Sequence, residues 1–138
     1  MRSVDELASI TVDCGFHIHD ELGPGLLESV YEIVLAQALT DRGLVVARQQ
    51  PIGITFRGMT IADAFRADLI VDGRLIVEIK SMEKTHPVHS KQLLTYLRLT
   101  KQPLGLLMNF GCATFREGVK RVANGHKDLC ALASWRET

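Results

Sequence analysis

The stretch from Phe65 to Lys80 constrains the fold of this chain most strongly. Two runs of β-type residues lie on either side of an Asp-Gly turn signal at positions 72 and 73, and this pattern predicts an antiparallel hairpin. Three charged residues, Asp68, Glu78 and Lys80, interrupt the apolar alternation of the two runs. Burying charges within a sheet is costly unless they bind something. The stretch therefore predicts a hairpin that carries a polar site.

The length of the hairpin loop decides whether these charges share one face. A two-residue loop would put Asp68 on the opposite face from Glu78. A three-residue loop with Gly73 in the left-handed conformation pairs Ile70 with Arg74 and puts all three charged side chains on one face. This register also aligns the apolar residues of both strands on the other face. We therefore predict the three-residue loop, and a two-residue hairpin would exclude a shared site.

Two carboxylates that converge on one point form a site for a hard cation. Mg²⁺ and Mn²⁺ prefer oxygen ligands and keep several waters, and Asp68 and Glu78 supply such oxygens. Lys80 can then orient an attacking water and offset the charge that builds up on a phosphate. The alternative is a salt-bridged edge of the sheet. Spacing alone favours neither interpretation, because E-x-K is common on strands.

The remaining patterns predict a single α/β domain over residues 1–138. A first helical pattern ends at Gly23, and a second runs from Leu26 to Gly43. The expected order is α-α-β-β-β-β-α-β with a short ending. The four expected strands after the two helices are Leu44–Gln50, Ile52–Arg57, Phe65–Val71 and Arg74–Lys80. They are followed by a helix at Pro87–Thr100 and a strand at Leu104–Asn109, and the ending has a strand at Gly118–Val122 and a helix at Lys127–Trp135. Pro51 separates the first two strands. The strand after the helical crossover is expected to pair in parallel.

Charge is distributed unevenly along the chain. Its 16 basic and 16 acidic residues cancel. Residues 1–41 nevertheless hold eight acidic groups and one basic group, and residues 42–138 hold fifteen basic and eight acidic groups. A neutral protein of this kind can still present a positive face to phosphate, so neutrality does not exclude a nucleic-acid partner.

The cysteines and the lengths of the apolar runs indicate the cellular compartment in which the protein is expected. Cys14, Cys112 and Cys130 are far apart and form no C-x-x-C pair, which favours a reducing compartment over a disulfide framework. No run of about 20 apolar residues and no targeting signal is present. We therefore expect a cytoplasmic protein without a membrane partner.

Three further polar residues lie at helix positions that can face a cleft. Glu28 lies at the border of the apolar face of the second helix, whereas Glu32 is expected to point further outward. A solvated glutamate near a helix N-terminus is the alternative for Glu28. Gln92 and Tyr96 are four residues apart on the third helix and so share one stripe. Packing residues are the alternative for this pair.

Basic residues that can contact phosphates lie in two places. Lys84 and Lys91 flank a short segment with two histidines before and within the third helix, and Arg121 lies in a basic group near the C-terminus. Each can follow a phosphate backbone. A solvated charged surface explains them about as well.

Several of these residues resemble a known family. Gly25, Glu28 and Tyr31 match the G-x-x-E-x-x-Y signature of a family of small bacterial proteins. Asp68 and the Glu78–Lys80 segment resemble the catalytic D…(D/E)-x-K of the PD-(D/E)xK nuclease superfamily, to which that family is assigned. Residues 65–69, 77–80, 89–97, 105–111 and 118–125 also resemble blocks of the family, in order along nearly the whole chain. One departure is Ala67, which stands where the superfamily pattern has proline.

The resemblance implies a restriction-endonuclease-like core, in which a central mixed sheet is flanked by helices, with a site for Mg²⁺ or Mn²⁺. It implies that Asp68, Glu78 and the Ile79 carbonyl hold the metal, that Glu28 completes the shell and that Lys80 positions the attacking water. In the branch that resembles lambda exonuclease, a glutamine and a tyrosine on the following helix approach the nucleic acid, which maps onto Gln92 and Tyr96.

The function implied is a metal-dependent nuclease that hydrolyses phosphodiester bonds, with DNA as the favoured substrate. The alternative is a catalytically silent nuclease-fold module that binds nucleic acid or a protein partner. A third interpretation is a toxin, defence or mobile-element accessory that acts on RNA or on a partner's DNA. A chain of 138 residues has little surface with which to grip a duplex, which is compatible with a homodimer.

Overall fold

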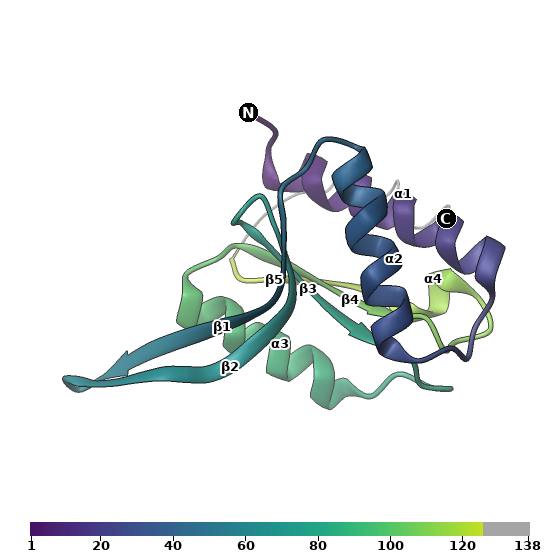
Figure 1. Ribbon diagram of the computed structural model, residues 1–138. Helices are drawn as coiled ribbons and strands as arrows, with labels where there is room; N and C mark the ends of the chain where they lie inside the picture. Colours follow the sequence, from purple (N-terminus) through teal and green to yellow (C-terminus); the bar gives the residue numbers. More distant parts are fainter. Residues whose placement is uncertain (126–138) are drawn as a thin grey trace.

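Helices cover both faces of a five-stranded sheet in the computed structural model, which describes residues 1–125 (Figure 1). The elements are α1 (Val4–Leu22), α2 (Glu28–Asp41), β1 (Val46–Phe56), β2 (Met59–Val71), β3 (Leu75–Lys80), α3 (Pro87–Thr100), β4 (Leu104–Asn109), α4 (Phe115–Gly118) and β5 (Val119–Ala123). The strands lie side by side in chain order. β3 and β4 pair in parallel, and the other neighbours pair antiparallel. This mixed sheet confirms the expected α/β architecture.

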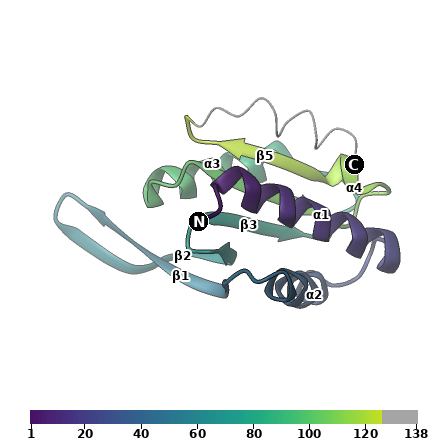
Figure 2. The same ribbon diagram turned by 90° about the horizontal axis from the view of Figure 1, so that it is seen from above.

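The two helical layers differ in which side of the sheet they cover. α1 and α2 lie over one face and α3 lies over the other (Figure 2). Side chains alternate along β3, so that Val77 and Ile79 pack in the core under α1 and α2, whereas Ile76 packs against α3. None of the helices within residues 1–125 is long and apolar enough to cross a bilayer.

The expected elements are wrong in the first half of the sheet: two expected strands are one, and the strand expected at Phe65–Val71 already begins at Met59, as β2. Ile52 lies in the same strand as Val46, because β1 runs without a break through Pro51. β1 is an edge strand, where a proline can leave its missing N–H on the open side. The observed order is therefore α-α-β-β-β-α-β, followed by α4 and β5. The helix expected at Lys127–Trp135 lies outside the described residues.

The second helix begins two residues later than expected, at Glu28. The Tyr31 hydroxyl donates a hydrogen bond to the Gly23 carbonyl at 2.6 Å and accepts one from the Leu26 backbone N–H at 3.1 Å. These two bonds hold the preceding loop in a non-helical path. The helix at Pro87–Thr100 and the strand at Leu104–Asn109 have the expected bounds.

The loop between β2 and β3 has three residues, as predicted, but the register differs from the expected one. Val71 pairs with Leu75, so Ile70 does not pair with Arg74. Asp72 and Gly73 are both left-handed, with φ of 50° and 68°, which moves the turn one residue further along the chain. A shift of this size keeps Leu69, Val71 and Leu75 on their predicted face, because side chains alternate with a period of two.

Beyond the body of the sheet, β1 and β2 continue as a two-stranded arm, which we call the β1–β2 arm (residues 53–64; Figure 1). Its tip is a two-residue turn at Arg57 and Gly58, whose φ values of 49° and 80° are both positive. This is the turn geometry that suits the natural twist of a hairpin.

Candidate metal and nucleic-acid site

β1 and β2 are both distorted where Asp68 lies. Gln49, on β1, has a left-handed φ of 51° although it is not a glycine. On β2, Ala67 and Ile70 both pack against the α3 side of the sheet, although residues three apart in a regular strand face opposite sides. The β2–β3 pairing also ends at Leu69. The distortion therefore frees the Asp68 side chain to turn toward β3.

Hydrogen bonds hold the Asp68 carboxylate in this position. Its Oδ2 accepts the Ile79 backbone N–H at 2.8 Å, and its Oδ1 accepts from Gln49 Nε2 at 3.2 Å. Gln49 Nε2 also donates to Glu32 Oε1 at 2.6 Å. A continuous chain of contacts thus runs from α2 through β1 to the Asp68 carboxylate.

Glu32 does not point outward, and that expectation was wrong. Its side chain is only 8% exposed, and Arg48 donates to it from Nε at 3.2 Å and from Nη2 at 3.1 Å. Arg48 lies opposite Leu69 on β2, which faces the α1–α2 layer. Arg48 therefore supplies the opposite charge that allows Glu32 to be buried. Glu32 and Gln49 are the two site residues that the sequence reasoning missed, and the only signal was a polar run at positions 48–50.

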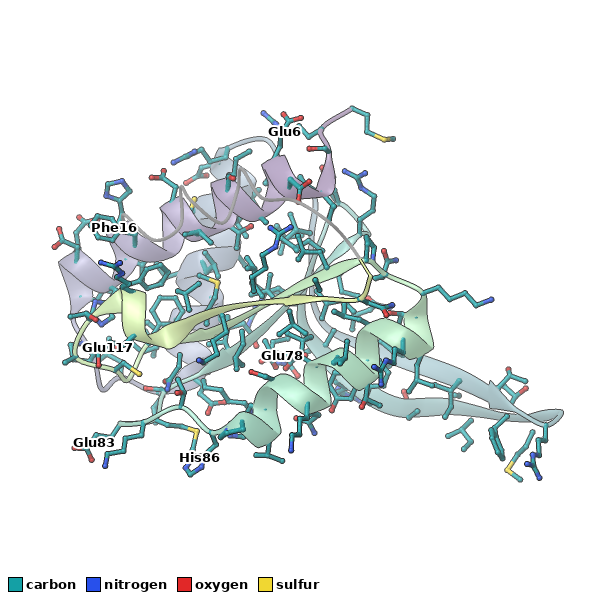
Figure 3. The ribbon with its side chains drawn as sticks, turned by 180° about the vertical axis from the view of Figure 1, so that it is seen from behind. Glu6, Phe16, Glu78, Glu83, His86 and Glu117 are labelled. Atoms are coloured by element: carbon teal, nitrogen blue, oxygen red, sulfur yellow. The ribbon has the colours of Figure 1, made fainter. Side chains whose placement is uncertain are left out.

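Glu78 lies between the sheet and α3 (Figure 3). It is 9% exposed, and within residues 1–125 its Oε1 has no hydrogen-bond partner. Burial, the Asp68 charge and a side-chain hydrogen bond with Asp68 raise the pKa of Glu78 from 4.5 to about 9, while Lys80 acts to lower it. A buried carboxylate oxygen without a partner, next to a second carboxylate, is what a bound divalent cation would satisfy. The residues present therefore fit Mg²⁺ or Mn²⁺.

The backbone of Ile79 faces the same point. Within a strand, the N–H and C=O of one residue point to the same neighbouring strand. The Ile79 N–H points to Asp68, and the β2–β3 pairing ends before this position. The Ile79 carbonyl is therefore directed toward Asp68. Lys80 is the last residue of β3 and lies on the same face as Glu78, half-buried.

From α3, Gln92 and Tyr96 reach the same region. The ring of Tyr96 stacks on Phe65 of β2, with centroids 3.8 Å apart and planes 6° apart. Burial raises the pKa of Tyr96, and the charges of Glu78 and Asp68 raise it further, while a hydrogen bond to Gln92 opposes them. The structure thus brings Tyr96 within electrostatic reach of the two carboxylates, with Gln92 hydrogen-bonded to it.

Glu28 lines a separate, open part of the site. A pocket of about 480 Å³ is lined by Glu28, by Ser81 after β3 and by the loop before α2. Ser81 Oγ donates to the Leu26 carbonyl, which holds the start of α2 against the end of β3. Within residues 1–125, no three His, Cys, Asp or Glu side chains are placed to hold one metal ion. Glu28 is therefore not placed as a third direct ligand beside Asp68 and Glu78.

Charges on both sides of the site act on His89, in the first turn of α3. Burial and the charges of Lys80 and His86 lower the pKa of His89, whereas Glu28 acts to raise it. His89 is therefore within electrostatic reach of both Lys80 and Glu28, at the start of α3.

The three basic residues expected to bind substrate separate into two groups. Lys84 and Lys91 are exposed, in the loop after β3 and on α3. Arg121 is not brought to the site. Its Nη2 pairs with Asp5 Oδ1 of α1 at 2.9 Å, and its side chain is 6% exposed. It lies opposite Leu106, whose side chain packs under α1, so it faces away from α3.

A family model described as the PD-(D/E)XK nuclease superfamily matches residues 5–122. The matched segment runs from α1 to β5 and contains every residue of the site described above. A search of curated proteins gave no match.

Proposed function

Because the chain belongs to the PD-(D/E)XK nuclease superfamily, we propose that it is a metal-dependent nuclease that hydrolyses phosphodiester bonds of nucleic acid, with DNA as the favoured substrate. The observation that carries this proposal is the buried Oε1 of Glu78, which has no hydrogen-bond partner among residues 1–125, beside the fixed carboxylate of Asp68. If this carboxylate pair only stabilised the sheet, we would expect a lysine or arginine side chain of the chain to form an ion pair with it.

We further propose that the chain is a member of the G-x-x-E-x-x-Y group. The signature residues have physical roles here. Gly25 has a φ of 98°, which favours glycine, and the fully buried Tyr31 stacks on Phe110 at 4.5 Å. Its hydroxyl holds the loop before α2. Together they present Glu28 at the pocket.

Asp68, Glu78 and the Ile79 carbonyl would hold the Mg²⁺ or Mn²⁺ ion. The ion supplies Lewis acidity that polarises the scissile phosphate. Glu78 has to lose its proton to serve as a ligand, so binding is coupled to proton release. Glu28 supports the site from the pocket side, through water.

Lys80 orients the attacking water and offsets the negative charge that develops on the phosphate. Gln92 and Tyr96 bind the nucleic acid next to the carboxylates. Lys84 and Lys91 contact flanking phosphates through their exposed ammonium groups. Arg121 is left out of this interface, because it is paired with Asp5.

The proposal is tested by incubating the purified full chain with labelled linear duplex, single strand and RNA, in Mg²⁺, Mn²⁺ or EDTA. We expect cleavage that requires the metal. Glu78→Gln and Lys80→Ala should each reduce the rate at least about a hundredfold, the size of effect seen when one transition-state contact is removed. Glu83→Gln, which changes an exposed carboxylate after β3, is the matched control and should cleave normally. Undiminished activity in either site variant would refute the assignment.

We place this activity in the cytoplasm. Within the described residues, both cysteines, Cys14 and Cys112, are buried free thiols. This state is typical of proteins in a reducing compartment.

A further inference from the structure

The β1–β2 arm exposes an apolar face. Phe56 pairs with Met59, and Ile54 pairs with Ile61 across the arm. Phe56, Met59 and Ile61 are 61%, 62% and 42% exposed. Two-stranded ribbons are marginally stable in water, and a contiguous apolar patch on one usually marks a binding surface.

This face is continuous with the candidate site. Ile52, on the same face of β1 as Ile54, packs against the α3 side of the sheet and pairs with Phe65. Phe65 in turn stacks on Tyr96, whose pKa responds to Asp68 and Glu78. Apolar and aromatic side chains therefore lead from the tip of the arm along β1 to Phe65 and Tyr96, past one register shift between Ile52 and Ile54 and past Asp63 on β2.

The surroundings of this face are basic. From Lys84 to Lys101 the chain has four basic residues and no acidic one, and this segment includes α3. At the tip of the arm, the Arg57 guanidinium lies over the Phe56 ring at 5.1 Å. The acidic excess of residues 1–41 lies in α1 and α2, on the other side of the sheet (Figure 2). Charge complementarity thus favours a polyanion as the partner of the arm.

We propose that the β1–β2 arm binds unpaired bases of the nucleic-acid strand whose backbone enters the site at Asp68 and Glu78. This proposal rests on the proposed function. A duplex presents phosphates outward, whereas the bases of a single strand offer flat apolar faces. The exposed face of the arm is mainly apolar, and its two charged groups, Arg57 at the tip and Asp63 between Ile61 and Phe65, cancel, so it fits bases better than a row of phosphates. Phe56, with Arg57 over its ring, is the stacking platform. The preferred substrate is therefore single-stranded or has a frayed end.

The test compares the two faces of the arm. Phe56→Ala with Met59→Ala removes the apolar pair, and Thr55→Ala with Thr60→Ala removes a paired set on the opposite face with a similar cost in β-propensity. Binding is measured by fluorescence anisotropy in Ca²⁺, with labelled single-stranded DNA, single-stranded RNA and duplex DNA. We expect the Phe56/Met59 variant to bind single strands at least about tenfold more weakly. The threonine variant and the duplex affinity should not change.

A second assay separates this proposal from the nuclease proposal. Bis(p-nitrophenyl) phosphate is too small to reach from the site to the arm, so its cleavage in Mn²⁺ should be the same in the Phe56/Met59 variant as in the wild type. If the wild type cleaves neither this compound nor the labelled nucleic acids but the variant still loses single-strand affinity, the nuclease proposal fails and the arm proposal stands.

Three results would overturn the arm proposal. The first is unchanged single-strand affinity in the Phe56/Met59 variant. The second is an equal loss for duplex and single strand, because the arm would then not select unpaired bases. The third is a wild-type dimer that becomes a monomer in the variant while nucleic-acid affinity is retained, since the arm would then join two copies of this chain.

Discussion

The two faces of the sheet differ in what they bury. Within the described residues, the core under α1 and α2 contains 21 buried residues, whereas the core under α3 contains five. The face toward α3 instead carries Glu78 and Lys80, with Gln92 and Tyr96 opposite them. One face thus holds most of the apolar packing, and the other has room for charged groups. β3 contributes side chains to both faces. Val77 and Ile79 pack in the larger core, and Glu78 and Lys80 lie on the face toward α3.

This comparison explains how a buried carboxylate is tolerated. The α1–α2 face fixes β3 through Val77 and Ile79, so Glu78 between them stays in place at a cost in free energy. Substitutions on the two faces should therefore have opposite effects on the metal-free protein.

The largest effect is expected from Leu35→Ala on the α1–α2 face. Leu35 is fully buried in the larger core, so its truncation should reduce the free energy of unfolding by about 2–5 kcal/mol. Urea denaturation measures this loss. Leu99→Ala, at an exposed position on α3, is the control and should change stability by less than about 0.5 kcal/mol. A loss below about 1 kcal/mol for Leu35→Ala would contradict the assignment of the main core to this face.

Glu78→Gln should stabilise the metal-free protein at neutral and alkaline pH. The folded chain holds the proton of Glu78 up to a pKa of about 9, whereas the unfolded chain releases it near 4.5. Unfolding therefore releases a proton between these values, and wild-type stability falls as pH rises through this window. From pH 5 to pH 8 the fall is at most about 4 kcal/mol.

Urea denaturation in EDTA at pH 5 and pH 8 checks this pH dependence. The wild type and the control Glu83→Gln should lose stability between the two values, and Glu78→Gln should lose much less. If all three proteins decline in parallel, Glu78 is not the group that titrates.

Gln49→Ala tests the contacts that fix Asp68. Removing the amide that donates to Asp68 and Glu32 should weaken Mn²⁺ binding about tenfold, because outer partners of metal ligands have effects of this size. Gln49→Gly is the matched variant. Glycine suits the left-handed φ of 51° but supplies no amide, so it should show the same loss. Normal affinity in the glycine variant would show that the backbone, and not the amide, matters.

The smallest effect is expected from Asp5→Asn, which alters the ion pair with Arg121 on the α1–α2 side. Because asparagine keeps an oxygen that can accept from the buried Arg121 guanidinium, the free energy of unfolding should fall by only about 1 kcal/mol, and cleavage of nucleic acid should not change. Thermal unfolding and the cleavage assay check both statements. If the folded variant loses cleavage, Arg121 contributes to substrate binding after all.

The sequence predicted those elements whose signals are local. The helix at Pro87–Thr100 and the strand at Leu104–Asn109 follow from the prolines at or just before their starts and from apolar periodicity. The Asp-Gly pair marks the hairpin turn, and the alignment of the apolar residues on one face predicts its three-residue length. The superfamily is confirmed, whereas the G-x-x-E-x-x-Y group and the roles of the site residues stay predictions.

The errors concern features that depend on distant partners. Glu32 is buried only because Arg48 and Gln49 come to it from another strand, and no helical periodicity contains that information. Pro51 is tolerated within β1 because β1 lies at the edge of the sheet, a fact that a single strand pattern cannot reveal.

The proposed function requires that the Asp68–Glu78 pair bind a divalent cation. Isothermal titration of Mn²⁺ into the full chain at pH 7, in buffers of different ionisation enthalpy, tests it most directly. We expect binding to the wild type and to Glu83→Gln with release of about one proton, and no measurable binding to Glu78→Gln. Equal Mn²⁺ affinity in the wild type and Glu78→Gln would contradict it.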